Sequence, residues 1–129
     1  ARFGDPETQV VLARLESPLS EIISSLLAKE QPTIAWNELA SVGVVVAAEG
    51  YPNQYKTNLP LPEMSGETIY YAGVTRSEQA LVSAGGRIFL AEATASTLEE
   101  ARKKVYQTLD NYSFPGMYYR KDIGVKGLI

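Results

Sequence analysis

The amino-acid sequence predicts an α+β fold: a mainly antiparallel sheet of about four strands with one long helix packed on it, preceded by an N-terminal helical segment. Runs rich in β-branched residues gather in the middle of the chain, and helical patterns lie on either side of them. The alternating helix and strand order of a parallel α/β sheet is absent. The 129 residues are enough for one core with an extension.

The N-terminal segment predicts two short helices, each preceded by a polar residue and a proline. Asp5-Pro6 provides a carboxylate suited to the N-cap and a proline suited to the first helical position, and Ser17-Pro18 repeats this signal. Apolar residues follow both signals at helical spacing. Gln31-Pro32 is expected to end the second helix, because the residue before a proline disfavours the α conformation.

Four runs are expected to form the strands, because they are rich in β-branched and apolar residues and are separated by glycine or proline. They are Val42–Glu49, Thr68–Val74, Ala80–Ala84 and Ile88–Thr94. The segment from Gly50 to Gly66 holds three prolines and is expected to be an irregular connection. Gly85-Gly86 is expected to link the last two strands as a tight hairpin.

The C-terminal part predicts a third helix and an edge strand. Thr97 and Glu100 have the spacing of a capping box, and the apolar residues after them predict a helix to about Asn111. The aromatic segment from Phe114 to Gly124 is expected to add a strand at the edge of the sheet.

The composition excludes several kinds of chemistry within this chain. There is no cysteine and no histidine, so disulfides, thiolate nucleophiles, Ser-His-Asp triads and metal sites built on Cys or His are excluded. The formal net charge of −3 argues against a nucleic-acid partner. The longest apolar run, Val42–Ala48, is shorter than the roughly 20 residues of a membrane helix, so we expect no membrane association. A reducing cytoplasm fits the absence of cysteine.

The segment Arg2-Phe3-Gly4-Asp5-Pro6-Glu7-Thr8-Gln9 resembles the signature of phosphoribosylamine-glycine ligases. That pattern is Arg, an apolar residue, Gly-Asp-Pro-Glu, any residue, then Gln or Glu, and every position fits. Further segments are similar to the C-terminal domain of the family and follow in the same order: Gly50-Tyr51-Pro52, Tyr71-Ala72-Gly73, Gly85-Gly86-Arg87, Thr97-Leu98-Glu99-Glu100-Ala101 and Met117–Gly124.

The resemblance implies that residues 1–31 are the helical end of an ATP-grasp domain and that residues 32–129 are the C-terminal α+β domain of such a ligase. Members of the family use ATP to join glycine and 5-phosphoribosylamine into glycinamide ribonucleotide, with ADP and phosphate as the other products, in purine synthesis. Their N-terminal α/β domain, most of the ATP-grasp domain and a Mg²⁺-binding Glu and Asn precede the signature and are not in this sequence. We therefore expect a fragment of a cytoplasmic ligase that is inactive alone and binds neither Mg²⁺ nor ATP.

By the same resemblance, Arg2, Asp5, Pro6 and Glu7 are expected at the rim of the active site as substrate-binding residues. The planar guanidinium of Arg2 suits a phosphate or carboxylate, and the Asp5 carboxylate suits an ammonium group. The chain is expected to hold no complete set of catalytic, cofactor-binding or metal-binding residues. Simple helix initiation also explains the spacing of Asp5, Pro6 and Glu7, and both roles are retained.

Three other segments have two interpretations each. Gly85-Gly86-Arg87 has the look of a phosphate-binding loop, but no helix follows it and a hairpin is favoured. Tyr118-Tyr119-Arg120 has the residues to stack on a base or ribose, although packing of the aromatic rings is the commoner outcome. The charged residues of the third helix are expected to form a solvated face without function: Glu99, Glu100, Arg102, Lys103 and Lys104.

A free-standing, non-catalytic binding or interaction module derived from this domain is the alternative to a ligase fragment. The coding sequence upstream of Ala1 would distinguish the two. If the N-terminal helices normally pack against an ATP-grasp domain, their apolar faces are left exposed in this chain, and self-association is expected.

Overall fold

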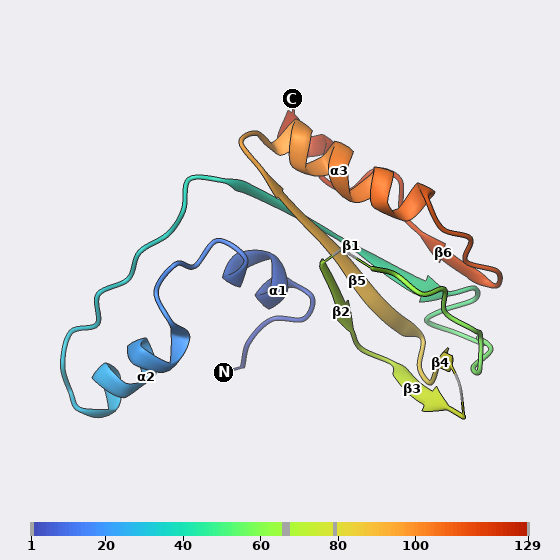
Figure 1. The fold of residues 1–129 in the computed structure, drawn as a ribbon, viewed down its shortest axis with the longest axis horizontal. Helices are drawn as coiled ribbons and strands as arrows, with labels where there is room; N and C mark the ends of the chain where they lie inside the picture. Colours follow the sequence, from blue (N-terminus) through green and yellow to red (C-terminus); the bar gives the residue numbers. More distant parts are fainter. Residues whose placement is uncertain (1, 66–67, 79, 129) are drawn as a thin grey trace.

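The computed structural model describes residues 2–65, 68–78 and 80–128, so that Gly66, the expected end of the irregular connection, lies outside them (Figure 1). The elements follow in chain order as α1 (Glu7–Leu12), α2 (Leu19–Leu27), β1 (Ala40–Ala48), β2 (Thr68–Tyr71), β3 (Val74–Ser77), β4 (Ala80–Ser83), β5 (Arg87–Ala95), α3 (Leu98–Asp110), β6 (Met117–Tyr119) and a final 3₁₀ turn (Val125–Leu128).

A four-stranded antiparallel sheet in the order β2-β5-β1-β6 forms the centre of the fold. Its two long strands pair from Ala40 opposite Ala95 to Ala47 opposite Arg87. The long helix α3 packs on one face of this pair, and α1 lies on the other side (Figure 1). The predicted α+β fold, with one long helix on a mainly antiparallel sheet, is confirmed.

The hydrophobic core lies between α3 and the sheet. Alternate residues of β1, among them Val44 and Val46, point toward α3 and are fully buried, as the two-residue period of a strand requires. From α3, Ala101, Val105 and Leu109 meet them at helical spacing and are also fully buried. This face of α3 is what the sequence pattern predicted.

Both N-terminal helices exist, but their predicted caps are wrong. α1 and α2 begin directly after Pro6 and Pro18, and neither start has a side-chain cap hydrogen bond. The Ser17 Oγ accepts a hydrogen bond from the Ala35 N–H at 2.8 Å, which ties the start of α2 to the segment before β1. Asp5 is also engaged elsewhere in the fold, as described below.

The second helix is shorter than predicted. α2 ends at Leu27, before Gln31-Pro32 is reached. Lys29 has a φ of 61°, the left-handed conformation that commonly follows a helix end. The Glu30 N–H then donates to the Ser25 carbonyl at 2.9 Å and closes the turn. The helix therefore ends by local backbone geometry rather than at the proline.

The predicted run Thr68–Val74 is two strands, and the predicted hairpin at Gly85-Gly86 is wrong. β4 pairs with β3 in a separate two-stranded sheet, whereas β5 lies in the main sheet. Gly73 lies between β2 and β3. Its N–H donates to the Arg87 carbonyl at 3.0 Å, and its carbonyl accepts from the Ala84 N–H at 2.8 Å. A Cβ on Gly73 would lie 2.8 Å from the Gly85 Cα, so only glycine allows the two backbones to approach this closely.

The predictions for the C-terminal part agree with the structure. The Thr97 Oγ1 accepts a hydrogen bond from the Glu100 N–H at 3.2 Å and caps α3. β6 pairs with β1 at the edge of the sheet, with Ala48 opposite Met117. The described part of the connection after β1, residues 50–65, forms no helix and no named strand.

Replacing a core leucine should show that α3 on the sheet is the main source of stability. We expect Leu109→Ala to lower the free energy of unfolding by about 2–5 kcal/mol, because it deletes buried methyl groups and leaves a cavity. Urea denaturation of the chain followed by circular dichroism measures this.

Leu27→Ala in α2 is the matched control, because the Leu27 side chain is 80% exposed. We expect it to change the free energy of unfolding by less than about 0.5 kcal/mol. Equal losses in the two variants would contradict the position of the core.

Candidate functional site

The signature segment, residues 2–9, is held on the sheet by the close approach of α1 to β1. At Gly43 an added Cβ would lie 2.6 Å from the Val10 Cγ2, so the missing side chain of Gly43 makes room for α1. At the start of α1, the Thr8 N–H and Oγ1 both donate to the Gly4 carbonyl, at 3.1 and 2.5 Å. The segment therefore has a defined path along the sheet.

Asp5 and Arg87 form an ion pair that joins the signature segment to the sheet. The Arg87 Nη2 donates to the Asp5 Oδ2 at 2.6 Å, across 82 positions of sequence. Both side chains are about half exposed, at 43% for Arg87 and 56% for Asp5. The predicted N-cap carboxylate of Asp5 thus serves a tertiary contact.

Arg87 is the first residue of β5, and its main chain is fixed on both sides. It lies opposite Ala47 in β1, and its carbonyl accepts the Gly73 N–H. The β1–β5 register shifts between Val46 and Ala47, immediately before this pair. Such bulges alter the direction of a side chain relative to a regular strand.

A small cavity lies beneath the ion pair. Its lining includes Asp5, Pro6, Gln9, Tyr70 and Arg87, and its volume is about 10 Å³, room for no more than about one water molecule. The Gln9 Oε1 is buried and has no hydrogen-bond partner among the described residues. The ion pair is therefore accessible from its exposed side.

The four predicted site residues lie within one short segment. Arg2 is exposed and makes no side-chain hydrogen bond or ion pair with any residue that the structure describes. Pro6 is half-buried against the sheet, and Glu7 is exposed at the first position of α1, with its carboxylate lying over Gly4. The segment thus presents two carboxylates and, with Arg87, two guanidinium groups.

This set of groups suits binding rather than proton transfer. Guanidinium groups remain charged and donate paired hydrogen bonds to carboxylates and phosphates. Carboxylates accept from ammonium and hydroxyl groups. Within residues 2–65, 68–78 and 80–128, no group of three or more Asp or Glu side chains is placed to hold a metal ion.

Arg87 is the residue of this site that the sequence reasoning missed. The sequence pattern Gly85-Gly86-Arg87 was weighed as a phosphate-binding loop, a hairpin was favoured, and nothing in local spacing connects Arg87 to Asp5. Its place in one of the segments that carry the family resemblance is the signal that points to it. A Cβ at Gly86 would lie 2.1 Å from the Tyr51 Cδ2, so the Tyr51 ring occupies the space beside this glycine. The phosphate-binding interpretation of Gly85-Gly86-Arg87 stays a prediction.

The aromatic tail packs on α3 rather than offering a stacking surface. The Tyr119 ring contacts the Tyr106 and Phe114 rings, with centroids 6.3 Å away in each case. Its hydroxyl donates to the Asp110 Oδ1 at 2.7 Å, and the Lys121 Nζ donates to the same oxygen at 2.8 Å. The hydrogen bond from Lys121 holds the pKa of Asp110 below its ordinary value, and the hydrogen bond from Tyr119 makes a smaller contribution in the same direction.

Contrary to the expectation from the sequence, Arg102 does not lie on a purely solvated face. Its Nε donates to the Ile123 carbonyl at 2.9 Å, and its Nη2 donates to the Lys121 carbonyl at 2.6 Å. Its guanidinium also lies over the Tyr106 ring, 4.7 Å from the centroid. Arg102 therefore fastens the C-terminal tail to α3.

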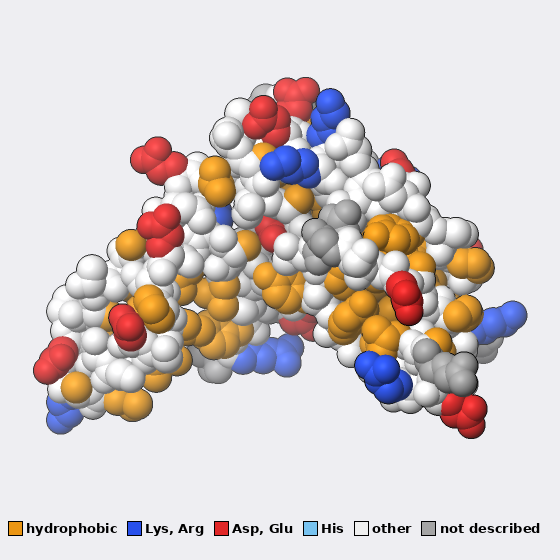
Figure 2. Space-filling view, in the orientation of Figure 1, with side chains coloured by type: hydrophobic (Ala, Val, Ile, Leu, Met, Phe, Trp, Pro, Cys, Tyr) orange, Lys and Arg blue, Asp and Glu red, His pale blue; other side chains and the backbone are white. Residues whose placement is uncertain are grey.

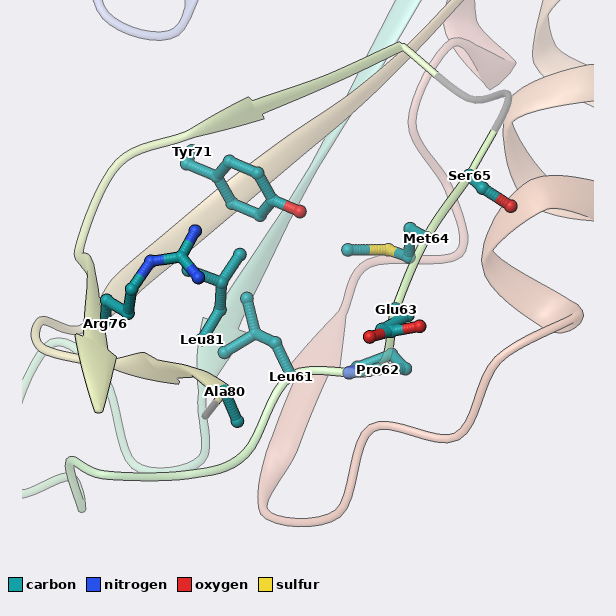
Figure 3. Close-up of a pocket in the computed structure, with 9 residues that line it drawn as sticks. All are labelled: Leu61, Pro62, Glu63, Met64, Ser65, Tyr71, Arg76, Ala80 and Leu81. Atoms are coloured by element: carbon teal, nitrogen blue, oxygen red, sulfur yellow. The ribbon is translucent and has the colours of Figure 1, made fainter. Parts of the chain in front are cut away.

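A larger hollow lies at the small sheet, away from the signature segment. Figure 3 shows Tyr71 and Arg76 on one side of it and residues 61–65 on the other. Its volume is about 380 Å³, and Arg76 and Glu63 are its charged lining residues. Arg76 forms no ion pair with any described residue, and the hollow has no cluster of groups that indicates a reaction.

Apolar side chains are exposed on the N-terminal helices. Figure 2 shows hydrophobic side chains gathered along the lower surface, from the N-terminal part to the sheet. In α2 only Ile22 is buried, whereas Ile23, Leu26 and Leu27 are 45%, 58% and 80% exposed. The predicted apolar face of α2 thus has little covering it within the described chain. None of the described helices is long and apolar enough to cross a membrane.

Comparison with known proteins places these features in a known family. Residues 41–126 match the family described as phosphoribosylglycinamide synthetase, C domain. Phosphoribosylamine-glycine ligases from Lactococcus lactis and Halalkalibacterium halodurans are 48% and 47% identical over 99% of this chain. The crystal structure of the ligase from Thermotoga maritima covers 95% of this chain with a TM-score of 0.86 and 30% identity. The chain spans about a third of the length of these relatives, between 31% and 32%.

The cluster at the end of α3 should make stability depend on pH in acid. Because the folded pKa of Asp110 is lowered, its contribution is present above the unfolded value of about 3.9 and is lost as the pH falls through the folded pKa. We expect Asp110→Asn to destabilise the chain at about pH 7, and we expect its difference from the wild type to be smaller at about pH 2. Urea denaturation at both pH values measures the difference.

Glu38→Gln, which removes an exposed carboxylate from the loop before β1, is the control. It should leave the pH profile close to that of the wild type. A destabilisation by Asp110→Asn that persists unchanged at low pH would contradict the charge-based explanation.

Proposed function

Because this chain belongs to the phosphoribosylglycinamide synthetase family, we propose that it forms the C-terminal part of a phosphoribosylamine-glycine ligase. The observation that carries this proposal is the identity of 48% to such a ligase over 99% of the chain. The family match to a C domain supports the C-terminal position.

The whole protein is proposed to join glycine to 5-phosphoribosylamine, a step of purine synthesis. In this reaction the glycine carboxylate attacks the terminal phosphorus of ATP, and ADP leaves. The amine of phosphoribosylamine then attacks the acyl carbon, and phosphate leaves as glycinamide ribonucleotide forms. Such a reaction depends mainly on positioning and on neutralising the phosphate charges.

The substrates are proposed to meet this chain at the signature segment. Arg2 is exposed and free to bind a phosphate or carboxylate. Asp5 has one carboxylate oxygen on Arg87 and one left for an ammonium or hydroxyl group. Pro6 sets the path of the chain between Asp5 and α1, and Glu7 offers a second carboxylate at the rim.

ATP and Mg²⁺ are proposed to bind on the rest of the longer protein. The family resemblance supports this proposal, because the Mg²⁺-binding Glu and Asn of the family precede the signature segment. On this proposal, residues 1–31 close an ATP-grasp domain, residues 32–129 form the C-terminal domain, and the isolated chain is inactive. We also propose a cytoplasmic location for the whole enzyme.

The function is tested with the full-length protein that contains this chain. We expect it to form ADP and glycinamide ribonucleotide from ATP, glycine and phosphoribosylamine, and we expect Arg2→Ala to lower kcat/KM by at least about a hundredfold. Coupled detection of ADP and mass spectrometry of the product measure both.

Arg120→Ala is the matched control, because Arg120 is an exposed arginine paired with Asp122 near β6, at the other edge of the sheet. It should stay within about threefold of the wild type. No ligase activity in the full-length protein would overturn the function. A change of less than about threefold in Arg2→Ala would remove Arg2 from the site.

The exposed apolar face of α2 is proposed to lead to self-association of the isolated chain. Light scattering should show a mass that rises with concentration, and Leu27→Glu should reduce this rise by placing a charge on the face. Val125→Glu is the control, because Val125 is a partly exposed apolar residue at the C-terminal end. It should leave the rise of mass with concentration unchanged. A strict monomer at high concentration would contradict the proposal.

A further inference from the structure

Arg87 has unused binding capacity at the edge of the signature segment. Its guanidinium carries five N–H donors, and among the described residues one side-chain hydrogen bond is formed, to the Asp5 Oδ2. The side chain is 43% exposed, so the remaining donors are open to a ligand. An arginine with this geometry suits a carboxylate or phosphate, which accepts two parallel hydrogen bonds.

The position of this guanidinium is defined more sharply than that of a typical surface arginine. Its backbone is held between β1 and Gly73, beyond a β-bulge, and its head is held by Asp5. Binding residues on strands with a second residue fixing their orientation are placed more accurately than residues on loops. An exposed ion pair contributes little to stability, so stability alone does not account for this arrangement.

We propose that Arg87 binds the anionic group of a small-molecule substrate, either the glycine carboxylate or the phosphate of phosphoribosylamine, and that Asp5 is a positioning residue for its guanidinium. This proposal rests on the proposed ligase function and adds a residue to that site. The substrate group approaches from the exposed side, because the cavity beneath the pair has a volume of only about 10 Å³.

Arg87 and Arg2 then act from two separate parts of the chain. Arg2 lies in the signature segment itself, whereas Arg87 lies at the start of β5 and reaches the segment through Asp5. The Asp5 carboxylate offsets the charge of Arg87 in the free site without using all of its donors. An incoming anion thus finds donors that are oriented before it binds, which lowers the entropic cost of binding.

The test is a kinetic comparison in the full-length ligase, with KM measured separately for glycine, phosphoribosylamine and ATP. We expect Arg87→Gln to raise the KM of one anionic substrate by about tenfold or more, and Arg87→Lys to fall between this variant and the wild type. The substrate whose KM rises identifies the bound group: glycine for a carboxylate, phosphoribosylamine for a phosphate.

Asp5→Asn separates positioning from direct binding. It should raise the same KM by about threefold or more, and the double variant Asp5→Asn with Arg87→Gln should raise it by less than the product of the two single effects, because part of the effect of Asp5 acts through Arg87. Guanidinium ion added at millimolar concentration should partly restore the activity of Arg87→Ala and leave the activity of Arg120→Ala unchanged. A residue with a merely structural role would show neither the selective KM change nor the rescue.

The failures of the two proposals are distinguishable. If the wild-type protein has no ligase activity, the proposed function fails. If the wild type is active and Arg87→Gln leaves the KM of glycine and of phosphoribosylamine within about twofold, the role of Arg87 is overturned alone. An increase in KM that is confined to ATP would also overturn the role of Arg87. Circular dichroism of each variant excludes unfolding as the cause of a change.

Discussion

The antiparallel pairing of β1 with β5 is the constraint on which the other parts of this structure depend. Its two-residue alternation turns Val44 and Val46 toward α3 and turns Gly43 toward α1. The first face makes the core, and the second lets the signature segment lie against the sheet. The register shift beside Ala47 then sets the start of β5, where Arg87 meets Asp5. Core and site are therefore two faces of one pair of strands.

Two sets of charged groups in the described chain have different roles. Near the C-terminus, Lys121 and Tyr119 both bond to Asp110, and Arg102 bonds to backbone carbonyls, so their hydrogen bonds connect parts of the fold. At the signature segment, N–H donors of Arg2 and Arg87 are left open. Open groups on a defined scaffold are what a binding site for small charged substrates requires.

The chain has the surface expected of one part of a larger ligase. Besides its charged signature segment, it has exposed apolar side chains on α2. Its relatives are about three times as long and are named as phosphoribosylamine-glycine ligases. In the proposed enzyme, this chain supplies the signature segment to the substrate site, and the nucleotide is held by the remainder.

Local pattern alone determined much of this protein. The buried face of α3, its Thr97 cap, the long strands and the edge strand follow from side-chain periodicity and capping chemistry, which act between residues close in sequence. The signature segment also pointed to the family. Only the tertiary structure decided that Asp5 pairs with Arg87 instead of capping α1, and that Ser17 accepts a hydrogen bond from the Ala35 backbone. It also decided that β3 and β4, which follow Gly73, form a sheet of their own. The physical reason is that a carboxylate, hydroxyl or backbone amide has several partners of similar energy, and the packing of distant segments selects one of them.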